Sequence, residues 1–344
     1  MTQEHWNTLL KIINGEIQTE KPIGFIIDSP WLPQWYGVSI LDYYTNDNIW
    51  FEANRKAVET FPEVMFFPGF WSEYGMCTEP SAFGSKMVWA ERNLPHADKI
   101  IENSGNIGQI KKPNVKTDGL LPFMLNRLIH NEENIKKFGH SVKFAVARGP
   151  LNIASFLMGT TEFMMAISMK PEETLKGLNT ITGFIEDWLS LQMETFPDID
   201  GILLLDDIVG FIGESDFKEF AKPFLKKIYG DFNVKVKFFH NDAHGFVCAP
   251  SLKGIGINLF NFSFEHGLGE MKELTGNSIV LLGNIPPRDV LAIGSVEDVK
   301  QSVKNALESV EDHSRIIWSC GGGMPPDVST DNIKAFISAV RESD

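Results

Sequence analysis

The chain has 344 residues, 43% of them hydrophobic and 22% charged, which allows either two small domains or one large barrel. Its formal net charge of −14 argues against a nucleic-acid or anionic-membrane surface, because phosphate binding needs clustered lysine and arginine. Three widely separated cysteines disfavour a disulfide framework and fit a reducing compartment. No stretch reaches the roughly 18 apolar residues that a membrane span needs, so we expect a cytoplasmic protein.

The chain opens with an amphipathic helical pattern, MTQEHWNTLLKIING, and short apolar runs follow it. Several runs are almost continuously hydrophobic, as in parallel strands that are covered on both faces. The predicted strands are residues 22–28, 64–70, 143–147, 201–206, 234–240, 258–262, 278–283 and 315–319. Helical patterns cover residues 170–195, 215–229, 295–310 and 329–341, and the third begins with Ser-Val-Glu-Asp, a capping-box pattern.

This alternation of strands and helices, without a Pro/Gly/Ser-rich linker, predicts a single (β/α)8 TIM barrel over residues 1–344. The alternative is a doubly wound sheet, which eight alternating strands favour less. The opening helix becomes an N-terminal extension of the barrel. The interval 71–141 is too long for one helix, so we expect a helical insertion near the barrel mouth.

Polar side chains gather where the predicted strands end. The stretch KFFHNDAHG, residues 237–245, ends an apolar run with several metal-capable groups, and Asp28, Asp207, Glu265 and Cys320 follow other strands. Catalytic groups of such barrels lie at the carboxyl ends of the strands, so these side chains are predicted to share one mouth. Asp207 is expected to hold a polar group of the substrate, with helix capping as its structural alternative.

The C-terminal half resembles the uroporphyrinogen decarboxylase superfamily, most specifically in the runs GNIPP followed by GSVEDV and in CGGGMPPDVSTDNIKAF. The superfamily implies a (β/α)8 barrel and includes two chemistries. One is cofactor-free porphyrinogen decarboxylation, and the other is zinc-dependent methyl transfer to or from a cobalamin (corrinoid) protein. The decarboxylases carry an arginine-rich stretch after the first strand, which holds a substrate with eight carboxylates. Here that place reads DSPWLPQWYG and has no arginine, which favours the methyltransferase branch.

The resemblance to this branch implies a zinc site made of His240, Glu265 and Cys320. Zinc of the branch is bound by a His-x-Cys pair, an acidic residue and a later cysteine, and Asp242 stands here where the pair has its cysteine. Asp242 is therefore either a further ligand or a residue that orients the imidazole or acts on the substrate, and His266 is an alternative ligand. Without a metal, His240 would be a hydrogen-bonded histidine at the barrel rim and Cys320 a small buried group.

An ion with fewer sulfur ligands is harder and better matched to oxygen, so the sequence favours demethylation of an ether. We expect transfer of a methyl group from a small methoxylated, aromatic substrate to the cobalt(I) of a corrinoid-binding partner protein, as in O-demethylation. Asp242 and Asp28 are the candidate proton carriers. Trp31, Trp35 and Tyr36 are the candidate aryl-binding residues, with packing under loops as their alternative. Methyl transfer from methylcobalamin to a thiol or to tetrahydrofolate is the near alternative, and decarboxylation the remoter one.

Overall fold

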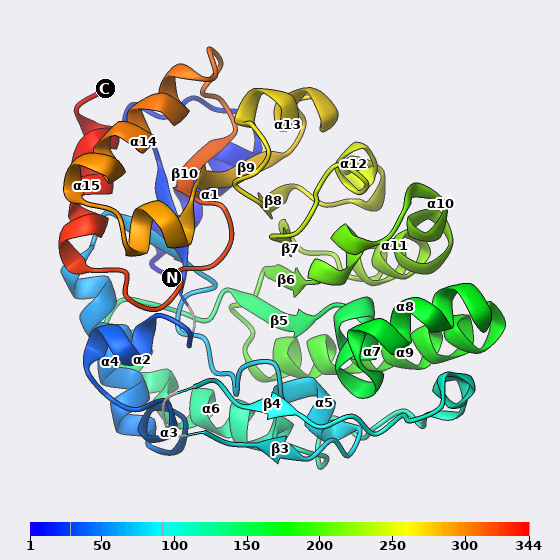
Figure 1. Ribbon diagram of the computed structural model, residues 1–344. Helices are drawn as coiled ribbons and strands as arrows, with labels where there is room; N and C mark the ends of the chain where they lie inside the picture. The colour runs from blue at the N-terminus through cyan, green and yellow to red at the C-terminus, as the bar shows by residue number, and fades with distance from the viewer. Residues whose placement is uncertain (28, 91–92, 344) are drawn as a thin grey trace.

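The computed structural model describes residues 1–27, 29–90 and 93–343, and within them eight parallel strands form one curled sheet with helices outside it (Figure 1). Every predicted apolar run forms one of these strands, so the predicted α/β barrel is confirmed. The strands are β1 (Ile23–Ile26), β2 (Val64–Phe67), β5 (Phe144–Arg148), β6 (Gly201–Leu205), β7 (Val236–Asn241), β8 (Leu259–Phe262), β9 (Val280–Ile285) and β10 (Ile316–Cys320).

Hydrogen bonds link these strands in the order β2-β1-β10-β9-β8-β7-β6-β5. The first strand, β1, pairs in parallel with both β2 and β10. The sheet therefore curls until the first and the last strand of the chain are neighbours. Strands β2 and β5 end the order, and the rings of Phe67 and Phe144 from these strands lie with centroids 6.2 Å apart. Because the strands are parallel, their carboxyl ends open at one common mouth.

The helices cover the outside of the sheet and include those predicted at residues 170–195, 295–310 and 329–341. The capping box is present at the second of these, where Ser295 accepts a hydrogen bond from the backbone of Asp298. The α-helices are α1 (Gln3–Ile13), α2 (Leu32–Tyr36), α3 (Ile40–Thr45), α4 (Asp47–Thr60), α5 (Thr78–Ala82), α6 (Leu121–Lys137), α7 (Pro150–Met158), α8 (Thr160–Met169), α9 (Pro171–Thr195), α10 (Glu214–Asp216), α11 (Lys222–Asp231), α12 (Leu252–Ile255), α13 (Leu268–Leu274), α14 (Val296–Glu308) and α15 (Thr330–Arg341). Short 3-10 segments are η1 (Ser104–Gln109), η2 (Asp207–Phe211) and η4 (Ala249–Ser251), and π-helical segments are η3 (Phe217–Ala221) and η5 (Pro287–Ala292).

One helical prediction needs correction. The helix predicted at residues 215–229 is divided into α10, η3 and α11, and Pro223 at the start of α11 lacks the N–H that a continuous helix would use. The interval 71–141 contains the helices α5 and α6, and the two-stranded ladder of β3 (Met87–Val88) and β4 (His96–Ala97) lies between them. Glycines and prolines recur through this interval and interrupt helices. Its longest helix, α6, belongs to the connection between β2 and β5.

One face of each strand fills the barrel interior. Phe67, Phe144 and Phe238 are buried there with Leu203, and α1 adds Trp6, whose ring packs edge-on against Phe144 at 5.5 Å. Phe144 is the first residue of its strand, so α1 closes the amino-terminal end of the barrel. Since that end is closed, a ligand can approach the interior from the mouth.

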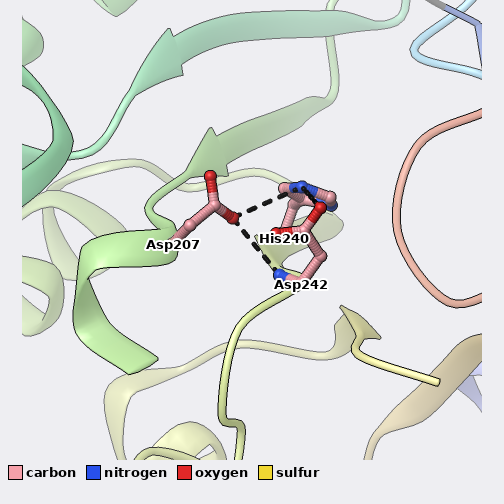
Figure 2. A group of neighbouring side chains, drawn as sticks. All are labelled: Asp207, His240 and Asp242. Carbon is pink, nitrogen blue, oxygen red and sulfur yellow. Dashed lines mark hydrogen bonds and ion pairs between the residues drawn. The ribbon is translucent and has the colours of Figure 1, made fainter. Parts of the chain in front are cut away.

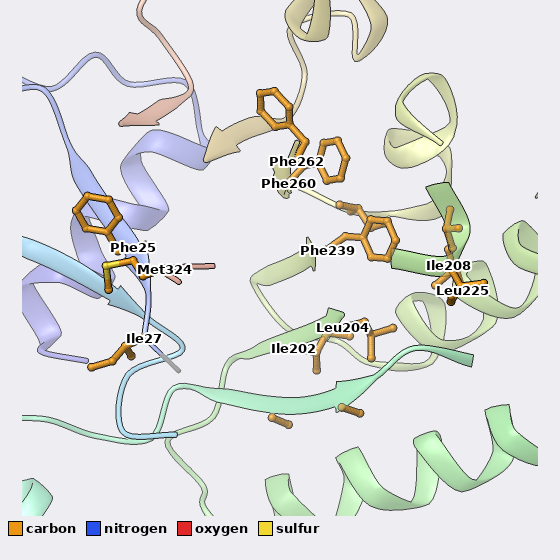
Figure 3. Packing of buried hydrophobic residues seen from close by; sticks show 14 of the residues in the cluster. Phe25, Ile27, Ile202, Leu204, Ile208, Leu225, Phe239, Phe260, Phe262 and Met324 are labelled. Atoms are coloured by element: carbon orange, nitrogen blue, oxygen red, sulfur yellow. The ribbon is translucent and has the colours of Figure 1, made fainter. Parts of the chain in front are cut away.

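The other face of the strands packs under the outer helices. Figure 3 shows this second layer, in which Leu204 and Phe239 from the strands lie near Ile208 and Leu225 from the segments that follow. Alternation along each strand assigns neighbouring residues to opposite layers. Among the helices of the described residues, none is long and apolar enough to cross a membrane.

Candidate metal centre

Three side chains from two adjacent strand ends meet in the barrel mouth: Asp207, His240 and Asp242 (Figure 2). One potential ligand atom from each lies within 4.8 Å of the other two. The Nε2 atom of His240 is 3.5 Å from Asp207 Oδ1 and 3.9 Å from Asp242 Oδ2. His240 is buried, whereas the two carboxylates keep 33% and 48% of their side-chain surface, so the group is open to solvent at the carboxylates.

Strand register brings these residues together. Leu205 of β6 pairs with His240 of β7, so the residues after Leu205 emerge beside the histidine. Phe238 faces the barrel interior, and His240 and Asp242 follow it at intervals of two residues, which keeps them on the same side. The backbone N–H of Asp242 donates to Asp207 Oδ1 at 3.2 Å and ties the two strand ends together.

A glycine two residues beyond the end of β10 leaves room for this group. Gly322 has φ +107°, a left-handed conformation that favours glycine, and a Cβ atom there would lie 3.1 Å from Asp242 Oδ2. The backbone at Gly322 therefore passes close to the Asp242 carboxylate.

Two buried asparagines contact His240 and Asp207, and the sequence patterns did not predict a role for them. Asn261 of β8 lies with Oδ1 2.7 Å from His240 Nδ1. Asn152 of α7 donates to Asp207 Oδ2 at 3.3 Å and accepts from the N–H of Ile208. The only sequence signal is a polar residue inside the apolar run NLFNF, which marks Asn261 as a buried group in need of a partner.

The two neighbouring aspartates after β6 have different environments. Asp206 is fully buried and accepts hydrogen bonds from the N–H groups of Leu151 and Asn152 at the start of α7. Burial raises the pKa of Asp206 well above its ordinary value, and its role is to hold that helix. In the mouth, loss of surrounding water and the nearby Asp207 carboxylate raise the pKa of Asp242.

The donor set fits a small divalent ion. A tetrahedral zinc ion with ligands at about 2.0–2.2 Å separates neighbouring ligand atoms by about 3.4 Å. The observed separations of 3.5 and 3.9 Å from His240 Nε2 therefore need only a small contraction, and the two carboxylate oxygens, which lie within 4.8 Å of each other, need a shift of about 1.4 Å at most. One imidazole nitrogen and two carboxylate oxygens leave a fourth position free, the arrangement of catalytic rather than structural zinc sites.

The structure does not bring the other two predicted ligands into this group. Glu265 lies in the loop three residues beyond β8, is 57% exposed, and points one carboxylate oxygen to His244 Nδ1 at 3.8 Å. Cys320 is buried with Ile316 and Trp318 in the outer layer, and its Sγ lies 3.5 Å from the carbonyl oxygen of Gly322. Their roles as ligands stay predictions.

The alternative ligand His266 is also engaged elsewhere. Its side chain is buried, and its Nε2 accepts a hydrogen bond from the backbone N–H of Gly245 at 3.0 Å. Asp28, the other predicted proton carrier, lies outside the described residues.

The predicted aryl-binding residues pack the loops around β1. Trp31 has no exposed surface and donates from Nε1 to the carbonyl of Val328, so no molecule reaches it in this structure. Trp35 donates to Thr330 Oγ1, and the ammonium of Lys56 lies over both Trp35 and Tyr36. A cavity of about 710 Å³ lies beside them, and its lining includes Gln34, Ser39 and Pro326 but not the three predicted aromatics or the metal group.

One cation faces the mouth from β5 and is already paired. Arg148 donates to Glu73 Oε2 at 3.1 Å, and its guanidinium lies 5.6 Å from the ring of Trp71. Glu73 also accepts a hydrogen bond from Ser29, so its charge is held from two sides. Burial raises the pKa of the neighbouring Glu79, which accepts from the backbone N–H of Arg148.

Fold and site together define an α/β-barrel protein with a candidate metal centre at the carboxyl ends of its strands. The chain belongs to the uroporphyrinogen decarboxylase (URO-D) family, whose model matches residues 32–343. This agrees with the superfamily that the C-terminal motifs indicate, and it extends the likeness into the N-terminal half.

Its relatives bear two kinds of name. The chain is 23% identical to uroporphyrinogen decarboxylase of Dichelobacter nodosus over 77% of this chain and 76% of the relative. It is 20% identical to that of Alcanivorax borkumensis over 97% and 96%. Among solved structures, a methyltransferase from Methanosarcina mazei has a TM-score of 0.82, 20% identity and 97% coverage of both chains. A B12-independent methionine synthase from Shewanella sp. W3-18-1 has a TM-score of 0.54, 11% identity and coverage of 94% of this chain and 99% of its own. At these identities the structural likeness shows the fold alone.

Proposed function

We propose that the protein is a zinc-dependent methyltransferase that moves a methyl group from a small methoxylated, aromatic substrate to the cobalt(I) of a separate corrinoid protein. The observation that carries the proposal is the group of Asp207, His240 and Asp242 with one open side in the barrel mouth. Cofactor-free decarboxylation does not require a group of side chains that can bind a metal ion. The structural likeness to a protein named a methyltransferase is consistent with this choice.

The stretch after the first strand lacks the cations that a decarboxylase would need, which argues against the other family chemistry. Residues 28–37, DSPWLPQWYG, contain no lysine, arginine or histidine. Arg148 is directed to the mouth but already balances Glu73. A substrate with eight carboxylates would meet mainly the negative charges of Asp207 and Asp242, which costs binding free energy unless a cation separates them.

In the proposed reaction, the carbon–oxygen bond of the methoxy group breaks and a cobalt–carbon bond forms. The electron pair comes from cobalt(I), and the ether oxygen leaves with the pair of the broken bond. A zinc ion held by His240, Asp207 and Asp242 would supply Lewis-acid stabilisation of that oxygen. Oxygen and nitrogen ligands, without thiolate, keep the ion hard and suited to oxygen.

The residues of the chain hold and prepare the site. His240 is fixed from behind by Asn261, and Asp207 by Asn152, so two of the three groups are oriented before any ligand arrives. Asp242 is the most exposed of the three, so it lies where a substrate from the mouth would meet the group.

Elemental analysis of purified protein tests the metal. We expect about one zinc per wild-type chain and loss of zinc in His240→Ala and Asp242→Asn. Glu214→Gln is the control, because Glu214 is an exposed carboxylate paired with Lys218 on a surface helix. Full zinc content in the two mouth variants would contradict the site.

Conversion of cobalt(I) to methylcobalt, followed by absorbance, tests the reaction with a corrinoid protein. Methoxyaromatics, methylamines and methanol form the substrate panel, and the Glu214→Gln variant again serves as control. We expect conversion with a methoxy compound and none in His240→Ala. A zinc-loaded wild-type protein that converts no methoxy compound would remove the donor-side proposal.

A further inference from the structure

The two ring nitrogens of His240 lie in different surroundings. Nδ1 is 2.7 Å from the side-chain oxygen of Asn261. Nε2 faces Asp207 and Asp242 at 3.5 and 3.9 Å. A neutral imidazole has one proton, and the nitrogen that carries it cannot bind a metal ion. The position of this proton therefore decides whether His240 can act as a ligand.

The hydrogen bonds of Asn261 fix which of its side-chain atoms faces the histidine. Its Nδ2 donates to the carbonyl oxygen of Leu282 at 2.8 Å and to that of Cys320 at 3.4 Å. Carbonyl oxygens only accept, so the amide nitrogen must point to them and the amide oxygen must point to His240. Asn261 has no exposed surface, so water does not offer another arrangement.

An oxygen at 2.7 Å accepts a hydrogen bond, and the proton it receives is the one on Nδ1 of His240. The carboxylates of Asp207 and Asp242 favour the other tautomer, because each would accept a proton carried on Nε2. Asn261 is thus the contact that favours the Nδ1 proton. Its position is fixed, since its strand pairs with β7 and β9 on either side.

We propose that Asn261 is a positioning residue that keeps His240 protonated on Nδ1 and leaves the lone pair of Nε2 directed at the candidate metal centre. The proposal rests on the proposed metal site, but the position of the proton can be measured without metal. Partners of this kind change metal affinity by about 10–100-fold when they are removed.

Nitrogen-15 NMR of histidine side chains in the full-length, metal-free protein tests the tautomer. The signal of His240 is assigned by its loss in His240→Gln, and spectra are taken near pH 8.5, about two units above the ordinary imidazole pKa. We expect the proton on Nδ1 in wild type. Asn261→Leu removes the acceptor at similar volume, and we expect the proton to move to Nε2. Asn261→Asp retains an oxygen at that position, and we expect it to restore the Nδ1 proton.

Asn332→Leu is the matched control. Asn332 is 5% exposed and donates to two backbone carbonyls, those of Leu291 and Gly294, both at 2.9 Å, but it lies in α15 and does not contact His240. Its substitution removes the same kind of buried amide without touching the imidazole. We therefore expect the wild-type tautomer of His240 in this variant.

Zinc affinity, measured by competition with a chelator, completes the test. We expect Asn261→Leu to weaken zinc binding by about 10–100-fold, Asn261→Asp to recover part of that loss, and Asn332→Leu to bind as wild type. A wild-type proton on Nε2, or equal zinc affinity in Asn261→Leu and Asn332→Leu, would overturn the proposal. An Nδ1 proton that depends on Asn261, in a wild-type protein that binds no zinc, would support the positioning role while rejecting the metal site.

Discussion

Replacing Asp207 with asparagine should change the stability of the protein in opposite directions without and with zinc. The substitution conserves shape and removes one of two carboxylates whose oxygens lie within 4.8 Å. Without a cation, the two negative charges repel each other, so their separation on unfolding favours the unfolded state. With a cation bound, the same charges are ligands, and loss of one weakens the complex.

The limit of 4.8 Å on the separation of the two carboxylate oxygens sets the scale of the repulsion in the metal-free protein. Two unit charges at this limit repel by about 0.9 kcal/mol in water and about 3.5 kcal/mol at an effective dielectric constant near 20. Asp207 and Asp242 are 33% and 48% exposed, so the lower end applies, about 1 kcal/mol. The asparagine has one acceptor oxygen, so loss of one of the two hydrogen bonds that Asp207 accepts offsets part of this gain. Unfolding entropy of about 2.1 cal/mol/K per residue gives ~0.7 kcal/mol/K for this chain, so Tm should rise by at most about 1–2 °C.

Zinc reverses the sign. At a free zinc concentration 100 times the wild-type Kd, binding adds about 2.7 kcal/mol, which raises Tm by about 4 °C. If Asp207→Asn weakens zinc by 100-fold, the same zinc adds about 0.4 kcal/mol and less than about 1 °C. Thermal unfolding in metal-buffered and chelator-treated samples measures both numbers. Glu265→Gln and Cys320→Ser are measured in the same way, because the family resemblance predicts Glu265 and Cys320 as ligands.

Two results would refute this reasoning. A variant that is less stable than wild type without metal would show that repulsion between the carboxylates does not dominate. A variant with an undiminished zinc response would remove Asp207 from the ligand set. If Glu265→Gln or Cys320→Ser abolishes the zinc response and Asp207→Asn does not, the predicted ligands hold the ion instead of the group in Figure 2.

Three further predictions concern the scaffold. Trp6→Ala should cost about 3–5 kcal/mol in urea unfolding, since the indole closes the barrel interior, and a cost below about 1 kcal/mol would contradict that role. Ser295→Ala should cost about 0.5–2 kcal/mol by loss of the capping box, and an unchanged urea midpoint would argue against it. Hydrogen bonds from Ser314 and Lys272 lower the pKa of Asp312, so its contribution is present above pH ~3.8 and is lost as the pH falls. The stability difference between wild type and Asp312→Asn should therefore shrink between pH 5 and pH 3, and a constant difference would contradict the linkage.

The sequence was a good guide wherever the signal is local. Continuous apolar runs predicted every strand of the sheet, because a parallel strand buried on both faces must be apolar throughout. Helix boundaries followed where a capping residue marks them, as at Ser295. The interval 71–141 was less well predicted, because its glycines and prolines interrupt helices without stating what replaces them.

By itself, the sequence determined that the chain builds a barrel, because apolar runs and helical patterns alternate along it. It also determined that His240 and Asp242 stand at a strand end, because that depends on residue order along one segment. The tertiary structure decided which distant groups lie beside them. Register between β6 and β7 brings Asp207 to the imidazole, and register between β7 and β8 places Asn261 behind it. Alternation turns Cys320 to the opposite face of its strand. A strand pair slipped by one residue would exchange those faces, and the sequence of one strand does not state its register with the next.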